Sequence, residues 1–125
     1  MSENLLEVRD SYWVQGERNE NWPLSKHSIA YAASLVVKTG PGKLYGIAGY
    51  NSGAAQFILI LDAAAVPANG VVPCLPITVP ATSNFSVFYG DIGRSFDTGI
   101  VVCNSSTAPT LTIGAADCFF DAQYL

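Results

Sequence analysis

From Ser28 to the C-terminus, the sequence consists of short runs rich in Val, Ile, Phe, Tyr and Thr, separated by clusters of Gly, Pro, Asn and Ser. Such runs are typical of β-strands, and the separating residues suit turns. This pattern nearly excludes helices. It predicts an all-β fold, an antiparallel β-sandwich, for which a jelly roll is one arrangement. The expected strands are 29–38, 43–50, 55–62, 75–79, 84–89, 98–104, 110–113 and 117–124.

The run AAQFILILD, which ends at Asp62, is apolar at every consecutive position from Phe57 to Leu61. In a strand, Phe57, Leu59 and Leu61 would point to one side, and Ile58 and Ile60 to the other. An antiparallel strand with one face in water alternates instead with polar residues. We therefore expect this strand to be buried twice, once in the core and once under the N-terminal segment or another copy.

The charge of the chain is concentrated at its N-terminus. Residues 1–28 hold eight charged side chains, and residues 29–125 hold only another eight. In a typical domain about a quarter of the residues are charged, and these charges keep its surface hydrated and keep protein molecules apart. Either Ser, Thr, Asn and Gly keep this body hydrated, or partners cover much of it. We favour partners, and expect a homo-oligomer, a trimer or a dimer.

Composition also argues against several partners and locations. The net charge is −4 and no cluster of Lys or Arg is present, so we expect no nucleic acid partner. No run approaches the roughly 20 apolar residues that span a bilayer, so we expect no membrane partner. The acidic N-terminus is unlike a signal peptide, and we expect the chain to stay in the cytoplasm.

Residues 1–28 differ in kind from the rest and are expected to form an extended N-terminal arm, followed by a sandwich domain over 29–125. The arm contains both tryptophans, Trp13 and Trp22, together with Tyr12. Large aromatic side chains in a polar segment need a surface against which to bury. That surface is either the sheet of the same chain or a neighbouring subunit.

Residues able to carry chemistry are sparse. The single histidine, His27, has no nearby carboxylate or cysteine in sequence. Asp91, Arg94 and Asp97 form the densest charged cluster of the body, which we interpret as an arginine braced by carboxylates in a tight connection. The alternative is a sugar or cation site.

The cysteines show neither zinc-ligand spacing nor a paired framework, and are interpreted as buried thiols, with pairing of Cys103 and Cys118 the alternative. We expect no catalytic residue, no cofactor and no metal.

Three stretches together resemble a known group of proteins: KLYGIAGYN, FILILDAAAVPANGVVP and FDTGIVVCNSSTAPTLTIGAADCFFDAQYL. They are similar to small tailed-bacteriophage proteins that accompany virion structural genes. The resemblance covers residues 43–125 and leaves the arm unmatched. It implies a β-sandwich accessory protein of the virion, of the capsid decoration or cement type, present in many copies.

These observations favour a virion structural protein, assembled in the host cytoplasm, whose partner is the major capsid protein or another virion protein. The expected assembly contacts are Tyr12, Trp13, Trp22, Phe57, Ile58, Leu59 and Ile60. The alternative is a carbohydrate- or receptor-binding module of a tail or fibre. Its aromatic stacking residues would be Trp13, Trp22, Tyr45, Tyr50 and Tyr89.

Overall fold

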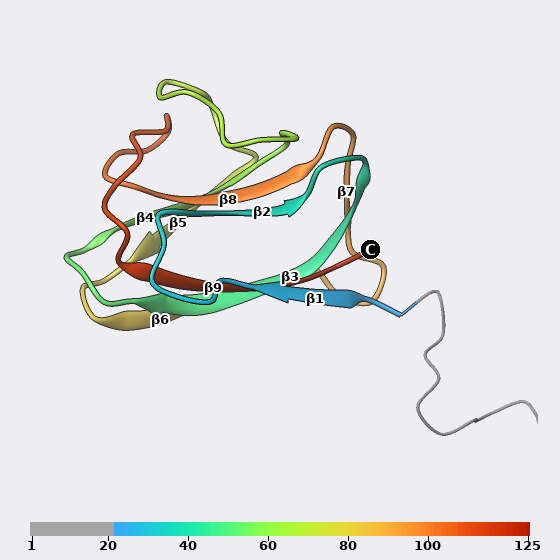
Figure 1. Cartoon of the computed structure of the whole chain (residues 1–125), viewed down its shortest axis with the longest axis horizontal. Helices are drawn as coiled ribbons and strands as arrows, with labels where there is room; N and C mark the ends of the chain where they lie inside the picture. The colour runs from blue at the N-terminus through green and yellow to red at the C-terminus, as the bar shows by residue number, and fades with distance from the viewer. Residues whose placement is uncertain (1–21) are drawn as a thin grey trace, which may run out of the picture.

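A computed structural model describes residues 22–125, which form nine β-strands and no helix (Figure 1). The described part of the chain therefore contains no helix that could cross a membrane. The strands are β1 (Leu24–His27), β2 (Ser34–Lys38), β3 (Gly42–Asn51), β4 (Gln56–Leu61), β5 (Leu75–Val79), β6 (Ser83–Phe88), β7 (Arg94–Phe96), β8 (Ile100–Ser105) and β9 (Cys118–Tyr124).

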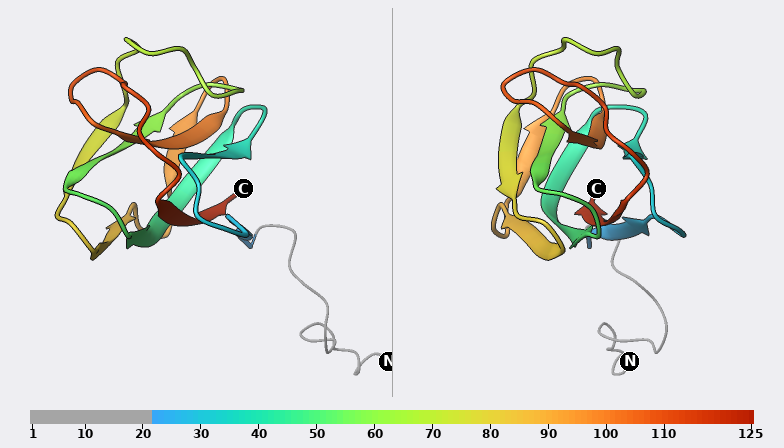
Figure 2. Two further views of the ribbon diagram at one scale, coloured as in Figure 1. Left: turned by 60° about the vertical axis from the view of Figure 1, so that its left-hand side comes forward. Right: turned by 90° about the vertical axis from the view of Figure 1, so that its left-hand side faces the viewer.

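The strands form two antiparallel sheets packed face to face, as the sequence predicted (Figures 1 and 2). One sheet has the order β1-β9-β3-β6, with β7 paired to the other end of β3; we call it sheet A. Sheet B has the order β2-β8-β4-β5. The chain passes from one sheet to the other at most of its connections, so the two sheets cannot separate as independent units.

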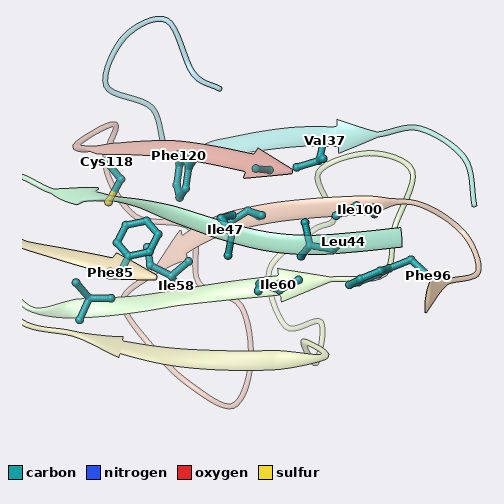
Figure 3. Packing of buried hydrophobic residues seen from close by; sticks show 13 residues of the cluster. Val37, Leu44, Ile47, Ile58, Ile60, Phe85, Phe96, Ile100, Cys118 and Phe120 are labelled. Carbon is teal, nitrogen blue, oxygen red and sulfur yellow. The ribbon is translucent and has the colours of Figure 1, made fainter. Parts of the chain in front are cut away.

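The core lies between the sheets and is built from inward-facing residues of both (Figure 3). Ile58 and Ile60 of sheet B face Ile47 and Phe120 of sheet A, and all four are buried. Gly49 is required here because an added Cβ would collide with the backbone carbonyl of Phe119 and with the ring of Phe85. Glycine at this position therefore allows β9 to lie close to β3.

Four local predictions are corrected by the structure. Strand β1 lies inside the predicted arm, where it pairs with β9, so the sandwich begins before residue 29. The predicted strand 29–38 begins only at Ser34, because residues 28–33 carry the chain from sheet A to sheet B. The predicted strand 110–113 makes only an isolated bridge, and the connection that contains Arg94 holds the short strand β7.

The second apolar face of β4 is buried, but its cover differs from the expected one. Leu59 and Leu61 pack with Val101 and Cys103 of β8 under Leu111, which comes from the loop between β8 and β9. That loop pairs with the loop between β4 and β5, through hydrogen bonds from Gly70 N to Leu111 O and from Leu111 N to Val71 O. Two loops of the same chain therefore cover this face, which corrects the expectation of an arm or a second copy.

Candidate functional site

The outer faces of the two sheets differ. In Figure 1 the yellow-green loop after β4 lies above the sheet that contains β8 and β2. No segment within residues 22–125 covers the outer face of sheet A in a comparable way: Ala48, Asn84, Ser86, Asp121 and Gln123 are all exposed. Exposed residues that converge on one face of a sheet are the first place to look for a binding site.

The register of sheet A places these side chains in rows across β9, β3 and β6. The rows are Gln123–Gly46–Phe88, Asp121–Ala48–Ser86 and Phe119–Tyr50–Asn84. A bulge between Leu44 and Gly46 brings Gly46 to the outer side, two positions before Ala48. The central strand therefore contributes small residues in two of the three rows, and the larger side chains of Gln123, Phe88 and Asp121 flank them.

This difference in side-chain size produces a groove along the outer side of β3. Three adjoining hollows, of about 520, 230 and 260 Å³, follow the strand. The first is bounded by Tyr50 and Phe119, the second has Gly46 and Ala48 as its floor, and the third ends at Tyr45. We call this feature the β3 groove.

Aromatic rings border the β3 groove at both ends. At one end, the ring of Phe119 stacks on the ring of Tyr31, with centroids 4.3 Å apart and planes 30° apart. At the other end, Phe88 is 74% exposed and lies beside Tyr45 and Pro23. Exposed rings of this kind provide flat apolar surfaces on which a ligand can stack.

Polar side chains along the groove are free to bind. The side chains of Asn84, Ser86, Asp121 and Gln123 make no hydrogen bond or ion pair with any residue in the described range. Two amides, a hydroxyl and a carboxylate together offer both donors and acceptors. The groove thus combines apolar rings with unused hydrogen-bonding groups.

His27 adjoins this groove. It pairs with Asp121 across β1 and β9, and its Nδ1 lies 2.9 Å from the carbonyl oxygen of Ser28. Sequence reasoning found no carboxylate near His27 because the partner is 94 positions away and is brought close only by strand pairing. Both side chains are exposed, which makes them available to a ligand on this face.

The assembly contacts expected from sequence fall in different places. Ile58 and Ile60 lie in the core, Leu59 lies under the two loops, and all three are fully buried. Phe57 is half-buried beside the same loops. Trp22 is 54% exposed at the start of the described chain. Tyr12 and Trp13 lie outside the described residues.

The two tyrosines Tyr45 and Tyr50, expected as stacking residues, both border the β3 groove. Tyr89 does not, because it packs against the core and its buried hydroxyl has no hydrogen-bond partner among the described residues. Of the four aromatic residues of the carbohydrate hypothesis that lie within the described range, the structure thus places two at the groove.

The connection between β7 and β8 is organised by Asp62 rather than by the charged cluster predicted there. Its carboxylate accepts hydrogen bonds from the backbone N–H groups of Asp97, Thr98 and Gly99, at 3.2, 2.9 and 3.2 Å. These bonds, that of Thr98 foremost, hold the pKa of Asp62 below its ordinary value. Arg94 lies over the ring of Phe96, 5.6 Å from its centroid.

A polar network closes one end of the sandwich. Gln56 donates to the side-chain oxygens of Asn51 and Asp117, at 2.8 and 2.9 Å, and Asn104 donates to Asp117 at 2.9 Å. These bonds join the ends of β3, β4, β8 and β9, so we interpret the network as structural.

The three cysteines are free thiols, as the sequence predicted, and no disulfide joins Cys103 to Cys118. Cys103 and Cys118 are buried as expected, whereas Cys74 is only half-buried. Burial raises the pKa of both Cys103 and Cys118 to about 11. A thiol with so high a pKa is a poor nucleophile near neutral pH. Within residues 22–125, no group of three His, Cys, Asp or Glu side chains is placed to hold a metal ion.

The other notable surface is the outer side of the two loops that cover sheet B. Residues 63–74 and 106–116 contain no charged side chain. Their exposed residues include Val66, Val71 and Val72, the last 69% exposed, and several alanines. We call this surface the uncharged cap.

The β3 groove was not predicted from the sequence. Its signal was present in the alternation of the exposed Asn84, Ser86 and Phe88 with buried or half-buried residues, and in the exposed alternate positions of β9. Strand pairing was needed to show that these positions share one face.

Comparisons with known proteins add no assignment: no protein-family model, curated protein or solved structure matches the chain.

Proposed function

We propose that this protein is a virion structural protein of a tailed bacteriophage, a capsid decoration or cement protein that binds and stabilises the particle. Its partners would be the major capsid protein or another virion protein and further copies of itself, as a dimer or trimer. Assembly would take place in the host cytoplasm.

The uncharged cap is the observation that carries this proposal. The two loops comprise 23 residues, and none of them is charged. Their exposed surface therefore lacks the charges that usually keep proteins apart. The loops are tied to each other and to the sheet, because Ile113 N donates to Asn69 Oδ1 at 3.0 Å and Leu111 is fully buried. Such a preordered apolar surface binds a partner at a low entropic cost.

Strand order gives independent support. With β7 set aside, β1-β9-β3-β6 facing β2-β8-β4-β5 is the order of an eight-stranded jelly roll, and we assign the sandwich to that arrangement. Jelly rolls occur in viral capsid and lectin domains, an analogy of fold that does not by itself determine function. The sequence resemblance to virion accessory proteins points in the same direction.

The mechanism would be mechanical. Burial of the cap against the particle would contribute about 25 cal/mol for each Å² of apolar surface removed from water. A protein that binds only the assembled shell stabilises that shell by mass action. The N-terminal segment would add contacts to a neighbouring subunit.

The deciding experiment is the analysis of gradient-purified particles of the phage that encodes this sequence. Quantitative mass spectrometry should find the protein in the particles at a copy number that matches capsid symmetry. Particles assembled without it should release their DNA at a lower temperature. The proposal fails if the protein is confined to the lysate and absent from the particles.

A carbohydrate- or receptor-binding module of a tail or fibre is the second candidate function. The specific observation that favours it is the β3 groove, which lies on the opposite sheet from the cap. The two functions are compatible, because a particle-bound protein that uses the cap would leave the groove exposed.

A further inference from the structure

We infer that the β3 groove is a binding site for a neutral oligosaccharide. This inference deepens the second candidate function and does not depend on attachment to a capsid. It rests on the shape of the groove, its aromatic borders, its free polar groups and the sign of its charge.

The shape suits a short linear ligand. From Gly46 to Tyr50 the groove follows four residue steps of β3, about 13 Å at the rise of a β-strand. Gly46 and Ala48 keep the floor low, and the hollows join through shared residues, Ala48 between the first two and Phe88 between the last two. A chain of several sugar rings could therefore lie along the strand.

The chemistry suits a sugar. A sugar ring has an apolar C–H face and a rim of hydroxyl groups that both donate and accept hydrogen bonds. Phe119, braced by Tyr31 at 4.3 Å, provides a rigid stacking surface for the apolar face. Asn84 and Gln123 can donate to and accept from hydroxyl groups, while Asp121 accepts.

The charge excludes anionic ligands. Among residues 22–125, the only acidic side chains that line the three hollows are Asp91 and Asp121, and neither lysine nor arginine lines any of them. Phosphate, sulfate or carboxylate groups would meet a negative surface, and nucleic acid binding requires cations that are missing here. The ligand is therefore a neutral saccharide rather than an acidic one.

Rigidity also favours binding. The groove floor is the middle of β3, which pairs on both sides with β9 and β6 along these rows. A site on paired strands needs little ordering when the ligand arrives, so less binding free energy is lost.

The experiment uses the full-length, ¹⁵N-labelled protein and four probes: chitotetraose, maltotetraose, mannotetraose and, as an anionic control, a heparin tetrasaccharide. At millimolar concentration, at least one neutral probe should shift the amide resonances of Gly46, Ala48 and their row partners. The heparin fragment should not. No shift with any neutral probe, or stronger binding of heparin, overturns the inference.

Variants then test the location. Ala48→Phe fills the floor of the groove without removing a hydrogen-bonding group, and should weaken binding of the neutral probe at least ~10-fold. Ser95→Phe places the same ring at an exposed position of β7, outside the three hollows, and should leave affinity unchanged. Unchanged affinity in Ala48→Phe overturns the inference.

Light scattering of Ala48→Phe separates a saccharide from a protein partner. If the groove is open to a saccharide, the variant should keep the mass of the wild-type protein. A changed mass would mean that a second copy occupies the groove, and would also overturn the inference. Absence from phage particles, by contrast, would end the decoration proposal and leave this result untouched.

Discussion

Asp62 shows how one side chain can position a connection that contains several charged residues. It follows β4 directly, and its carboxylate accepts hydrogen bonds from three consecutive N–H groups of the β7–β8 turn. Asp91 and Asp97 looked more suitable in sequence because they lie close to Arg94. The distance of 35 positions between Asp62 and Asp97 hid the actual contact.

Replacing Asp62 with Ala should therefore destabilise the fold although the side chain is exposed. We expect a loss of about 1 kcal/mol in the free energy of unfolding, below the roughly 1.5–3 kcal/mol of hydrogen bonds to a charged group, because water competes for these exposed bonds. Asp97→Ala, whose carboxylate accepts no hydrogen bond among the described residues, should change stability little. Urea denaturation of both variants checks this, and equal losses would contradict it.

The same contact makes the stability of the fold depend on pH, in a direction that follows from the pKa of Asp62. The pKa of Asp62 is lower in the folded state than its ordinary value of 3.8, so the unfolded chain binds the proton more readily. The stabilisation is present above pH 3.8 and is lost as the pH falls through the lower folded-state pKa. The stability difference between the wild-type protein and Asp62→Ala should accordingly shrink in acid.

Among the elements, β1 changes the division of the chain. Its four residues pair with β9, so that Leu24 lies opposite Tyr124 and His27 lies opposite Asp121. Ser28 continues this contact: its N–H donates to Phe120 O at 2.9 Å, and its hydroxyl accepts a hydrogen bond from Phe120 N at 3.0 Å. Residues 24–28 therefore belong to the sandwich rather than to an arm.

Two truncations should separate these segments. Removal of residues 1–21 leaves every described contact of the sandwich in place and should not change the unfolding midpoint. Removal of residues 1–28 also deletes β1, which should cost about 2–4 kcal/mol for the lost ladder and leave β9 as an exposed edge prone to pairing. Circular dichroism and urea denaturation measure both. Unfolding of the shorter truncation would mean that residues 1–21 contribute to the core.

What the sequence could and could not predict depends on how far apart in the chain the residues that determine each feature lie. Alternation and β-branched residues are local, so strands such as β4 and β8 were predicted within one or two residues. Strands β1 and β7 were missed because LSKH and RSF have little apolar character and exist only through their partners. The cover of β4 was missed because Leu111 belongs to a loop whose position depends on pairing with Gly70 and Val71. The groove was missed for the same reason, since it is a property of register.

For the molecule as a whole, these contacts produce two unlike faces. Sheet B presents an apolar, charge-free loop surface, while sheet A presents small, aromatic and polar residues with two carboxylates at the groove. The core between them joins the faces in a fixed relation. This separation suits a protein that attaches through one face and leaves the other accessible.

We therefore predict that the isolated protein, whose uncharged cap is not covered by a particle, is a dimer or trimer that associates through that cap, since closed symmetry is the usual outcome of a self-complementary patch. Val72→Glu should shift it to a monomer of 13.2 kDa in light scattering at micromolar concentration, because the new charges would meet in the interface. Thr39→Glu adds the same charge at an exposed turn residue outside the cap and should keep the oligomer. A wild-type protein that is already monomeric, or a Val72→Glu oligomer of unchanged mass, would show that the cap does not mediate self-association.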